Sequence, residues 1–123
     1  MSYYLEGVEQ LGPEEFKQLV YDDEDSTIII DVREAEEYKE GHIPGVPFLP
    51  MHHLPEVIDQ FRKDYSYLFV CRNGSRSQHA ALYFKAHGIE NVRNYAGGML
   101  AWDEPIKEGI EYPLRSISIL YEA

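Results

Sequence analysis

Apolar runs alternate with amphipathic stretches along this chain, a pattern typical of strands that are followed by helices. Three runs, at residues 27–32, 67–70 and 91–95, have the length and composition of buried strands. Two shorter candidates lie at 8–11 and 46–50, and the prolines around the second favour the edge of a sheet. The uninterrupted β-branched run at 27–32 predicts burial on both faces, and therefore a central parallel strand.

Helical patterns separate these runs. A helix should begin at Pro13, because proline suits the first helical position and two acidic residues follow it. Further helices are expected at 55–61 and 77–87, and residues 33–39 should form a short helix or a turn. This alternation predicts an α/β fold over 1–123, a single domain with a mainly parallel five-stranded sheet flanked by helices on both faces.

The pattern weakens after Trp102. Ile117, Ile119 and Tyr121 alternate with serines, which is compatible with a strand or with an extended tail that packs elsewhere. We therefore expect residues 103–123 to form a C-terminal tail and assign no secondary structure to it.

Composition and charge narrow the classes of function. The chain has 123 residues, 44% of them hydrophobic, and a formal net charge of −11. So acidic a chain has little basic surface for nucleic acid. It contains neither a signal-peptide pattern nor a membrane-length apolar run, so we expect a cytoplasmic protein. We also expect a monomer or a weak dimer. Adjacent His52 and His53 diverge, so no metal or other cofactor is expected.

The only cysteine, Cys71, lies where the 67–70 strand gives way to a polar loop and a helix. The loop residues are Arg72, Asn73, Gly74, Ser75, Arg76 and Ser77. Backbone N–H groups at a helix N-terminus attract anions, and nearby cations favour the thiolate form of cysteine. A buried structural cysteine is the simpler interpretation, but two arginines and a glycine beside the thiol favour a nucleophile.

Other candidate residues follow neighbouring strands. Asp31 and Arg33 stand at the end of the 27–32 run, and Gly97 and Gly98 follow the 91–95 run. Carboxyl ends of parallel strands share one edge of the sheet, so these residues should border the Cys71 loop. We expect Asp31 to hold loop amides or an arginine, and His42 to be a structural hydrogen-bonding residue rather than a base.

Four motifs in this order resemble a single-domain rhodanese. They are Asp31-Val32-Arg33-Glu34 with Glu37-Tyr38, Gly41-His42-Ile43-Pro44-Gly45, Cys71-Arg72-Asn73-Gly74-Ser75-Arg76-Ser77, and Gly97-Gly98-Met99-Leu100-Ala101-Trp102. Each motif alone is only weak evidence for the family, whereas the four together in this order are specific and cover roughly residues 8–102.

The resemblance implies a thiosulfate-type sulfurtransferase. Cys71 would take a sulfane sulfur from a small donor such as thiosulfate and pass it on as a persulfide. Amides of residues 72–76 would point inward and stabilise the charge, Arg76 would orient the donor, and Arg72 would add positive potential. Because the chain has one cysteine, the acceptor, a small thiol or an acceptor protein, must come from outside.

Two alternatives remain at this stage. A rhodanese-like binding or regulatory module would keep the fold without efficient catalysis. A cysteine-dependent phosphatase would use a similar cysteine–arginine loop. The six residues from Cys71 to Arg76 match the shorter sulfurtransferase loop, Val70 stands where those phosphatases usually have histidine, and the loop holds no carboxylate to act as general acid.

Overall fold

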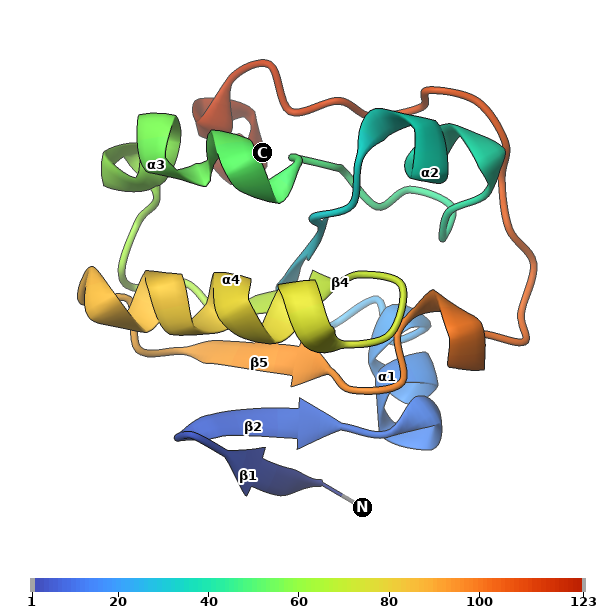
Figure 1. Ribbon diagram of the computed structural model, residues 1–123, viewed down its shortest axis with the longest axis horizontal. Coiled ribbons are helices and arrows are strands. Elements are labelled where there is room, and N and C mark those ends of the chain that lie inside the picture. The colour runs from blue at the N-terminus through green and yellow to red at the C-terminus, as the bar shows by residue number, and fades with distance from the viewer. Residues whose placement is uncertain (1, 123) are drawn as a thin grey trace.

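The computed structural model describes residues 2–122, and Met1 and Ala123, the two ends of the expected domain, lie outside the described residues. One sheet of five strands has the order β1-β2-β5-β4-β3 (Figure 1). The strands are β1 (Tyr3–Leu5), β2 (Val8–Leu11), β3 (Ile28–Asp31), β4 (Tyr67–Val70) and β5 (Val92–Tyr95). Only the β1–β2 hairpin is antiparallel among the described pairs. The predicted mainly parallel α/β sheet is confirmed.

The membership of the sheet differs from the prediction at one edge. Tyr3–Leu5 supplies the fifth strand, and the prediction of a strand at 46–50 is wrong. Phe48 alone forms parallel bridges, to Asp31 on one side and to Pro113 on the other. Proline lacks the N–H that a continuous ladder requires, so the flanking prolines limit this segment to isolated bridges.

Residues 2–122 also contain four α-helices and four short 3₁₀ helices. The α-helices are α1 (Pro13–Val20), α2 (Ala35–Glu40), α3 (Leu54–Val57) and α4 (Ser75–Ala86). The 3₁₀ helices are Met51–His53, Ile58–Gln60, Met99–Ala101 and Ile117–Tyr121. The longest helix, α4, begins two residues before the predicted start at 77, which brings Ser75 and Arg76 into its first turn.

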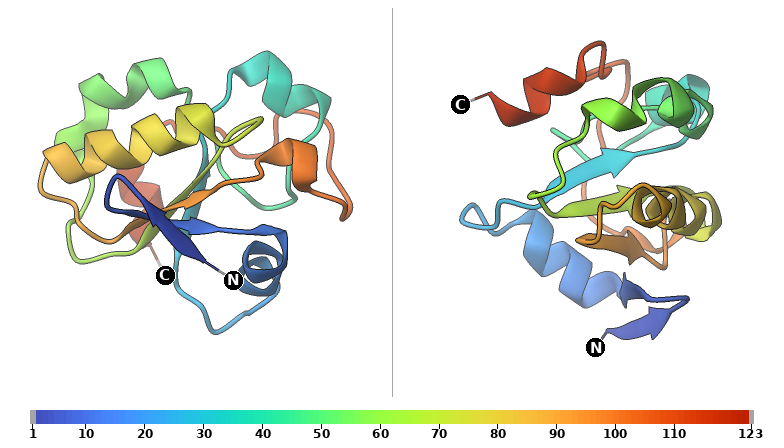
Figure 2. Two further views of the ribbon diagram at one scale, coloured as in Figure 1. Left: turned by 60° about the horizontal axis from the view of Figure 1, so that its bottom comes forward. Right: turned by 90° about the vertical axis from the view of Figure 1, so that its left-hand side faces the viewer.

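Helices cover both faces of the sheet, as predicted (Figure 2). On one face α1 packs Phe16 against Tyr95, with the ring centroids 3.9 Å apart. On the other face Phe84 of α4 packs against Phe69, alongside the buried Leu54 of α3. β4, between β3 and β5, is buried along its whole length, so its carboxyl end is held firmly from both sides.

The C-terminal tail packs onto the body of the protein. Lys107 forms an antiparallel bridge with His42, and Leu114 and Ile117 are buried. The Tyr121 hydroxyl lies 2.5 Å from that of Tyr67. Residues 117–121 form a short 3₁₀ helix with Ile117 buried, rather than a strand or an extended segment.

A buried histidine ties this tail to the body. The His42 ring is fully buried and stacks on Tyr38 with centroids 3.7 Å apart. Its Nδ1 lies 3.0 Å from the Tyr38 carbonyl oxygen, and its Nε2 lies 2.9 Å from Oε1 of Glu111. Each ring nitrogen therefore lies within hydrogen-bonding distance of an oxygen, one from the backbone and one from the tail. The expectation of a structural hydrogen-bonding role for His42 fits these contacts.

The carboxylate of Glu111 should make the stability of the protein depend on pH in the acidic range. The backbone N–H of Gly45, followed by His42, lowers the pKa of Glu111 from 4.5 to about 2. Since the folded state binds this proton less tightly than the unfolded state, the stabilisation is present above about pH 4.5 and is lost as the pH falls towards 2. Glu111→Gln should therefore lower the urea midpoint at pH 7, and the difference from wild type should shrink below pH 4.5.

The control for this prediction is Glu108→Gln, which removes the same charge from an exposed position in the same tail. Its urea midpoint should follow that of the wild type at every pH. A Glu111→Gln protein that behaves in the same way would show that the tail does not depend on this carboxylate.

Candidate active site

The thiol of Cys71 lies at the floor of the loop that joins β4 to α4. Its sulfur accepts hydrogen bonds from the backbone N–H of Gly74 at 3.2 Å and from that of Ser77 at 3.3 Å. The Ser77 hydroxyl lies 3.2 Å from the same sulfur. Cys71 has 0% exposure. The sulfur is therefore surrounded by donors, and a reactant has to bring an atom down to it.

Two glycines allow the loop to fold in this way. Gly74, the N-cap residue of α4, has φ 89°, and a Cβ there would collide with the carbonyl oxygen of Ala96. Gly98 has φ 61°, and a Cβ there would collide with the carbonyl of Arg72. Both residues occupy a left-handed backbone region that side chains disfavour. The prediction that Gly98 borders the Cys71 loop is confirmed.

Residues 96–100 thus act as a clamp on the loop. The backbone N–H of Met99 donates to the Cys71 carbonyl at 2.9 Å, and that of Leu100 donates to the Arg72 carbonyl at 3.1 Å. These bonds connect the end of β5 to the end of β4, so the sulfur is positioned by two adjacent strands at once.

The donors to sulfur differ in part from the expected set, the amides of residues 72–76. Gly74 belongs to that set, but Ser77 lies beyond it and contributes both its amide and its hydroxyl. The amide of Ser75 instead donates to Oδ1 of Asn73 at 3.1 Å. Asn73 therefore stabilises the turn by a local side-chain bond, which is a common role for asparagine.

Arg76 is held by a carboxylate from another helix. Its Nη1 donates to Oε1 of Glu37 at 2.7 Å and its Nη2 donates to Oε2 at 2.9 Å. These bonds lower the pKa of Glu37 to about 2, although partial burial acts in the opposite direction. Both outer nitrogens of the guanidinium thus already face a carboxylate that stays ionised at neutral pH.

Asp31 and Arg33 form a second internal pair. Both side chains are buried, and Nη2 of Arg33 donates to Oδ2 of Asp31 at 2.8 Å. The same nitrogen donates to the Gly41 carbonyl at 2.9 Å. Asp31 also accepts the backbone N–H of Arg33 at 3.0 Å, so it contacts both an amide and an arginine, the two kinds of partner expected for it, and this arginine secures the segment that carries Glu37.

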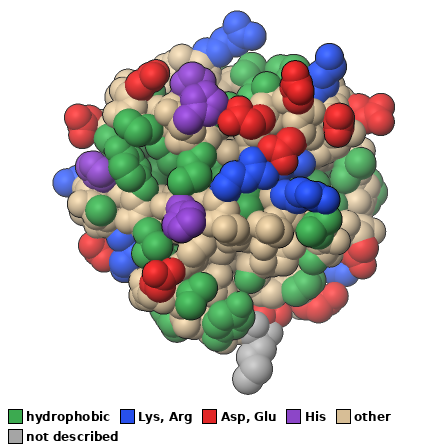
Figure 3. All heavy atoms as spheres, viewed as in Figure 1, with side chains coloured by type: hydrophobic (Ala, Val, Ile, Leu, Met, Phe, Trp, Pro, Cys, Tyr) green, Lys and Arg blue, Asp and Glu red, His purple; other side chains and the backbone are tan. Residues whose placement is uncertain are grey.

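A depression of about 460 Å³ opens beside the loop. It is lined by Arg33, Glu37, Glu40, Gly41, Arg72, Met99 and Leu100. Arg72 is exposed and, within the part of the chain that the structure describes, makes no side-chain hydrogen bond or ion pair. Basic and acidic side chains lie close together on the face drawn in Figure 3, with histidines and hydrophobic side chains beside them.

Three buried amide side chains support the loop from below, and the sequence analysis did not identify them. Nδ2 of Asn94 donates to the Gly74 carbonyl at 3.0 Å and to Oε1 of Gln10 at 2.8 Å. Nε2 of Gln10 donates to Oε1 of Gln78 at 2.6 Å. The signal in the sequence was weak: Gln10 and Asn94 are polar residues at interior positions of two predicted strands.

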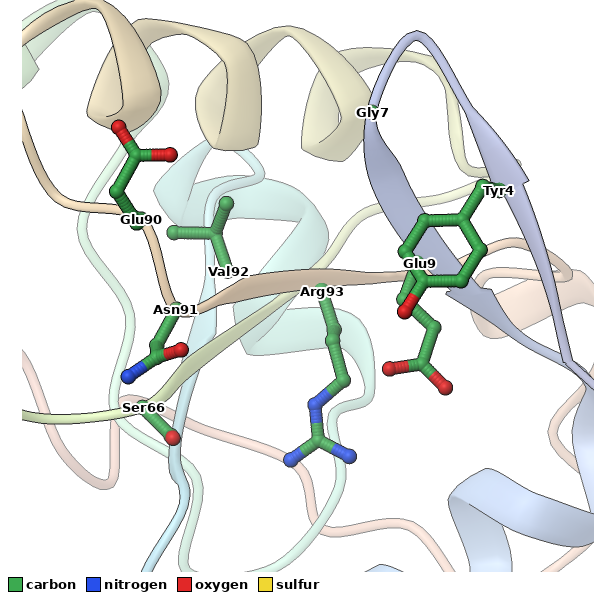
Figure 4. A pocket seen from close by; sticks show the side chains of 8 residues that line it. All are labelled: Tyr4, Gly7, Glu9, Ser66, Glu90, Asn91, Val92 and Arg93. Atoms are coloured by element: carbon green, nitrogen blue, oxygen red, sulfur yellow. The ribbon is translucent and has the colours of Figure 1, made fainter.

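Other parts of the molecule lie away from this site. A smaller hollow of about 180 Å³, lined by Ser66, Asn91 and Arg93 among others, lies at the amino ends of β4 and β5 (Figure 4). Cys71 follows the opposite, carboxyl end of β4. Among residues 2–122 no group of His, Cys, Asp and Glu is arranged to hold a metal ion, and no helix there could cross a membrane.

Comparison with known proteins adds three relevant similarities. Thiosulfate sulfurtransferase GlpE of Pseudoalteromonas translucida is 33% identical over 89 residues, which are 72% of this chain and 85% of the relative. A solved rhodanese-like domain protein of Staphylococcus aureus is 34% identical with a TM-score of 0.72, covering 80% and 96% of the two chains. A solved protein of Rhodopseudomonas palustris, described as a possible tyrosine phosphatase, is 28% identical with a TM-score of 0.75, covering 81% and 85%.

The family model of the rhodanese-like domain matches residues 12–105. This match includes the β4–α4 loop, whose groups donate hydrogen bonds to the Cys71 sulfur, the Arg76–Glu37 pair and the glycine clamp after β5. The sequence and the fold therefore agree, and the chain belongs to the rhodanese-like domain family.

Proposed function

We propose that the protein is a sulfurtransferase that carries a sulfane sulfur on Cys71 as a persulfide. The observation that carries this proposal is the convergence of three donors on the Cys71 sulfur, two backbone amides and the Ser77 hydroxyl, all within 3.3 Å. Such donors stabilise a thiolate, and the N-terminus of a twelve-residue helix adds its dipole. The similarity to a thiosulfate sulfurtransferase supports the same conclusion.

In the first half-reaction the Cys71 thiolate attacks the outer sulfur of the donor. With thiosulfate, the new Cys71 S–S bond forms as the S–S bond of thiosulfate breaks, and sulfite leaves with the electron pair. The products are the anionic persulfide of Cys71 and sulfite, so charge and atoms balance and no external oxidant is needed. The hydrogen-bond donors of the loop then face the persulfide anion, which remains within hydrogen-bonding range.

In the second half-reaction an acceptor takes the outer sulfur of the persulfide. Cyanide in an assay gives thiocyanate, and a thiol gives a new persulfide; in both cases Cys71 returns as a thiolate. Since Cys71 is the only cysteine of the chain, a resolving thiol within the chain is not available. The acceptor is a separate molecule, either a small thiol or the cysteine of a partner protein.

A phosphatase is the second candidate, because one structural neighbour is described as a possible tyrosine phosphatase. The geometry supports this activity less well. The donors of Gly74 and Ser77 are directed at the sulfur itself, which has no exposure, and a tetrahedral phosphoryl group needs more space than one sulfur atom. The six residues from Cys71 to Arg76 also contain no carboxylate to protonate a leaving alkoxide.

Removing the nucleophile tests the central assignment. Cys71→Ser should fold normally but lose thiosulfate:cyanide sulfurtransfer, because a serine hydroxyl does not hold a sulfane sulfur under these conditions. Intact mass spectrometry of the wild type after incubation with thiosulfate should show one added sulfur, absent from the variant. A wild-type protein that gains no sulfur from any donor would instead support a binding or regulatory module.

The Ser77 hydroxyl should contribute to the reactivity of the thiol. Ser77→Ala removes one of the three donors to sulfur while the two amides remain. We expect alkylation of Cys71 at pH 7 to slow roughly tenfold, which corresponds to about 1.4 kcal/mol of lost thiolate stabilisation. Ser75→Ala is the matched control, since its exposed side chain makes no bond to sulfur; an equal loss in both variants would contradict this role of Ser77.

Substrate preference separates the two candidate chemistries. The wild type should transfer sulfur from thiosulfate measurably and hydrolyse aryl phosphates negligibly. Insertion of one glycine after Gly74 should weaken sulfurtransfer, because the amides of Gly74 and Ser77 would no longer converge on the sulfur. Both activities are measured on the same preparation, and faster phosphate hydrolysis by the unmodified protein would refute the argument from the size of the loop.

A further inference from the structure

Arg76, the cation expected to bind an anionic sulfur donor, is already paired with a carboxylate. Glu37 binds both outer nitrogens of Arg76 in a two-point contact, the geometry in which a guanidinium also binds sulfonate or phosphate oxygens. The Glu37 carboxylate is itself only 32% exposed and is held in place by a further bond, because its Oε1 accepts the backbone N–H of Glu34 at 3.1 Å. A donor that needs this face of Arg76 must displace a carboxylate.

The remaining charge around the opening is close to balanced. Arg33 is paired with Asp31, and Glu40 lines the same depression as Arg72. Arg72 is therefore the one cation there that is left without a partner among the described residues. Because Arg76 and Glu37 neutralise each other, a dianion such as thiosulfate meets one free cation, Arg72, and one further carboxylate, Glu40.

The opening also has an apolar side. Met99 and Leu100 line the depression, and Leu100 is 67% exposed although it is a large hydrophobic residue. Ile106, 53% exposed, packs its Cδ1 close to Gly41 on the same rim. An exposed apolar rim beside a single free cation suits a carrier with an alkyl or peptide stem and little charge.

Resting on the sulfurtransferase function proposed above, we propose that Glu37 is a specificity-determining residue that directs the site towards alkyl persulfides and away from small dianionic donors. The favoured donor is R–S–SH, in which R is a small thiol or a cysteine-containing peptide. The Cys71 thiolate attacks the outer sulfur, the S–S bond of the donor breaks, and R–SH leaves after taking the proton. The product is the same Cys71 persulfide anion.

The burial of the thiol supports this choice of donor. The outer sulfur of an alkyl persulfide stands on a narrow divalent neighbour, whereas that of thiosulfate stands on a sulfonate group with three oxygens. Cys71 has no exposure at the floor of the loop, so a narrow donor reaches its sulfur with less displacement of Arg76 and Glu37. Size and charge therefore favour the same class of donor.

The test compares two donors in single-turnover loading of Cys71, followed by mass spectrometry: thiosulfate and cysteine persulfide. Wild type should load faster from cysteine persulfide. Glu37→Gln keeps an oxygen for the Glu34 amide but loses the charge and the two-point contact with Arg76. This variant should raise kcat/KM for thiosulfate about tenfold and change that for the persulfide less than threefold.

The matched control is Glu40→Gln, which removes one negative charge from the same depression without touching Arg76. Its gain with thiosulfate should be less than about twofold. The proposal would be overturned by an equal gain in kcat/KM for thiosulfate in both variants. It would also be overturned if Glu37→Gln lowered kcat/KM equally for thiosulfate and for cysteine persulfide. Glu37 would then be only an electrostatic or structural residue. Thermal unfolding of each variant checks that the fold is intact.

A further arm separates the sources of the persulfide. A short uncharged peptide with one persulfidated cysteine is compared with cysteine persulfide, on wild type and on Leu100→Ser. Slower loading of Leu100→Ser from the peptide alone would identify a peptide or protein carrier, and equal rates would identify a small thiol; both results agree with the proposal. Failure of Cys71 to load from any donor would refute the sulfurtransferase function itself, whereas a wild-type preference for thiosulfate would refute only the role of Glu37.

Discussion

A sulfur atom with no exposure to solvent must obtain its stabilisation from the protein, and much of the surrounding structure serves this requirement. A thiolate in such a place needs donors at hydrogen-bonding distance, because bulk water does not reach it. Gly74 and Ser77 supply these donors only if the backbone turns tightly after β4. That turn in turn requires the left-handed conformation of Gly74, the clamp at Gly98 and the amide of Asn94 on the Gly74 carbonyl. Cys71 is therefore positioned by two segments that are distant in sequence, its own loop after β4 and the end of β5 with the turn that follows it.

Local patterns were sufficient to predict the elements that carry the site. The strand at 67–70, the turn at Gly74 and the helix after it lie within about twenty residues, and each has a local physical cause. The strand predicted at 46–50 was wrong for an equally local reason, since its prolines prevent a continuous ladder. Tyr3–Leu5 was missed because its three exposed residues give no burial pattern, and only pairing with β2 makes it a strand.

The side-chain pairs at the site were not predictable in the same way. Arg76 and Glu37 are 39 residues apart, and although Glu37 belongs to one of the motifs, the sequence gives no sign that it pairs with Arg76. The network of Gln10, Gln78 and Asn94 has the same character, because three polar residues on three elements meet only when the sheet has formed. The contact of Glu111 with His42 depends on a tail whose pattern was ambiguous. Long-range complementarity decides such contacts, and a single sequence does not record it.

The distribution of charge connects these observations. In a chain with a net charge of −11, Glu37 pairs with Arg76, whereas Arg72 has no partner among the described residues. Stabilisation of the sulfur then depends mainly on short hydrogen bonds from Gly74 and Ser77, which salt screens little because the sulfur is buried. Under the proposed function, attraction of a donor would depend instead on Arg72, whose exposed charge is easily screened by salt. In the proposed sulfurtransferase the fold would thus separate two tasks that a free Arg76 would combine: the reactivity of the thiol would be set inside the loop, and the selection of the donor at its rim.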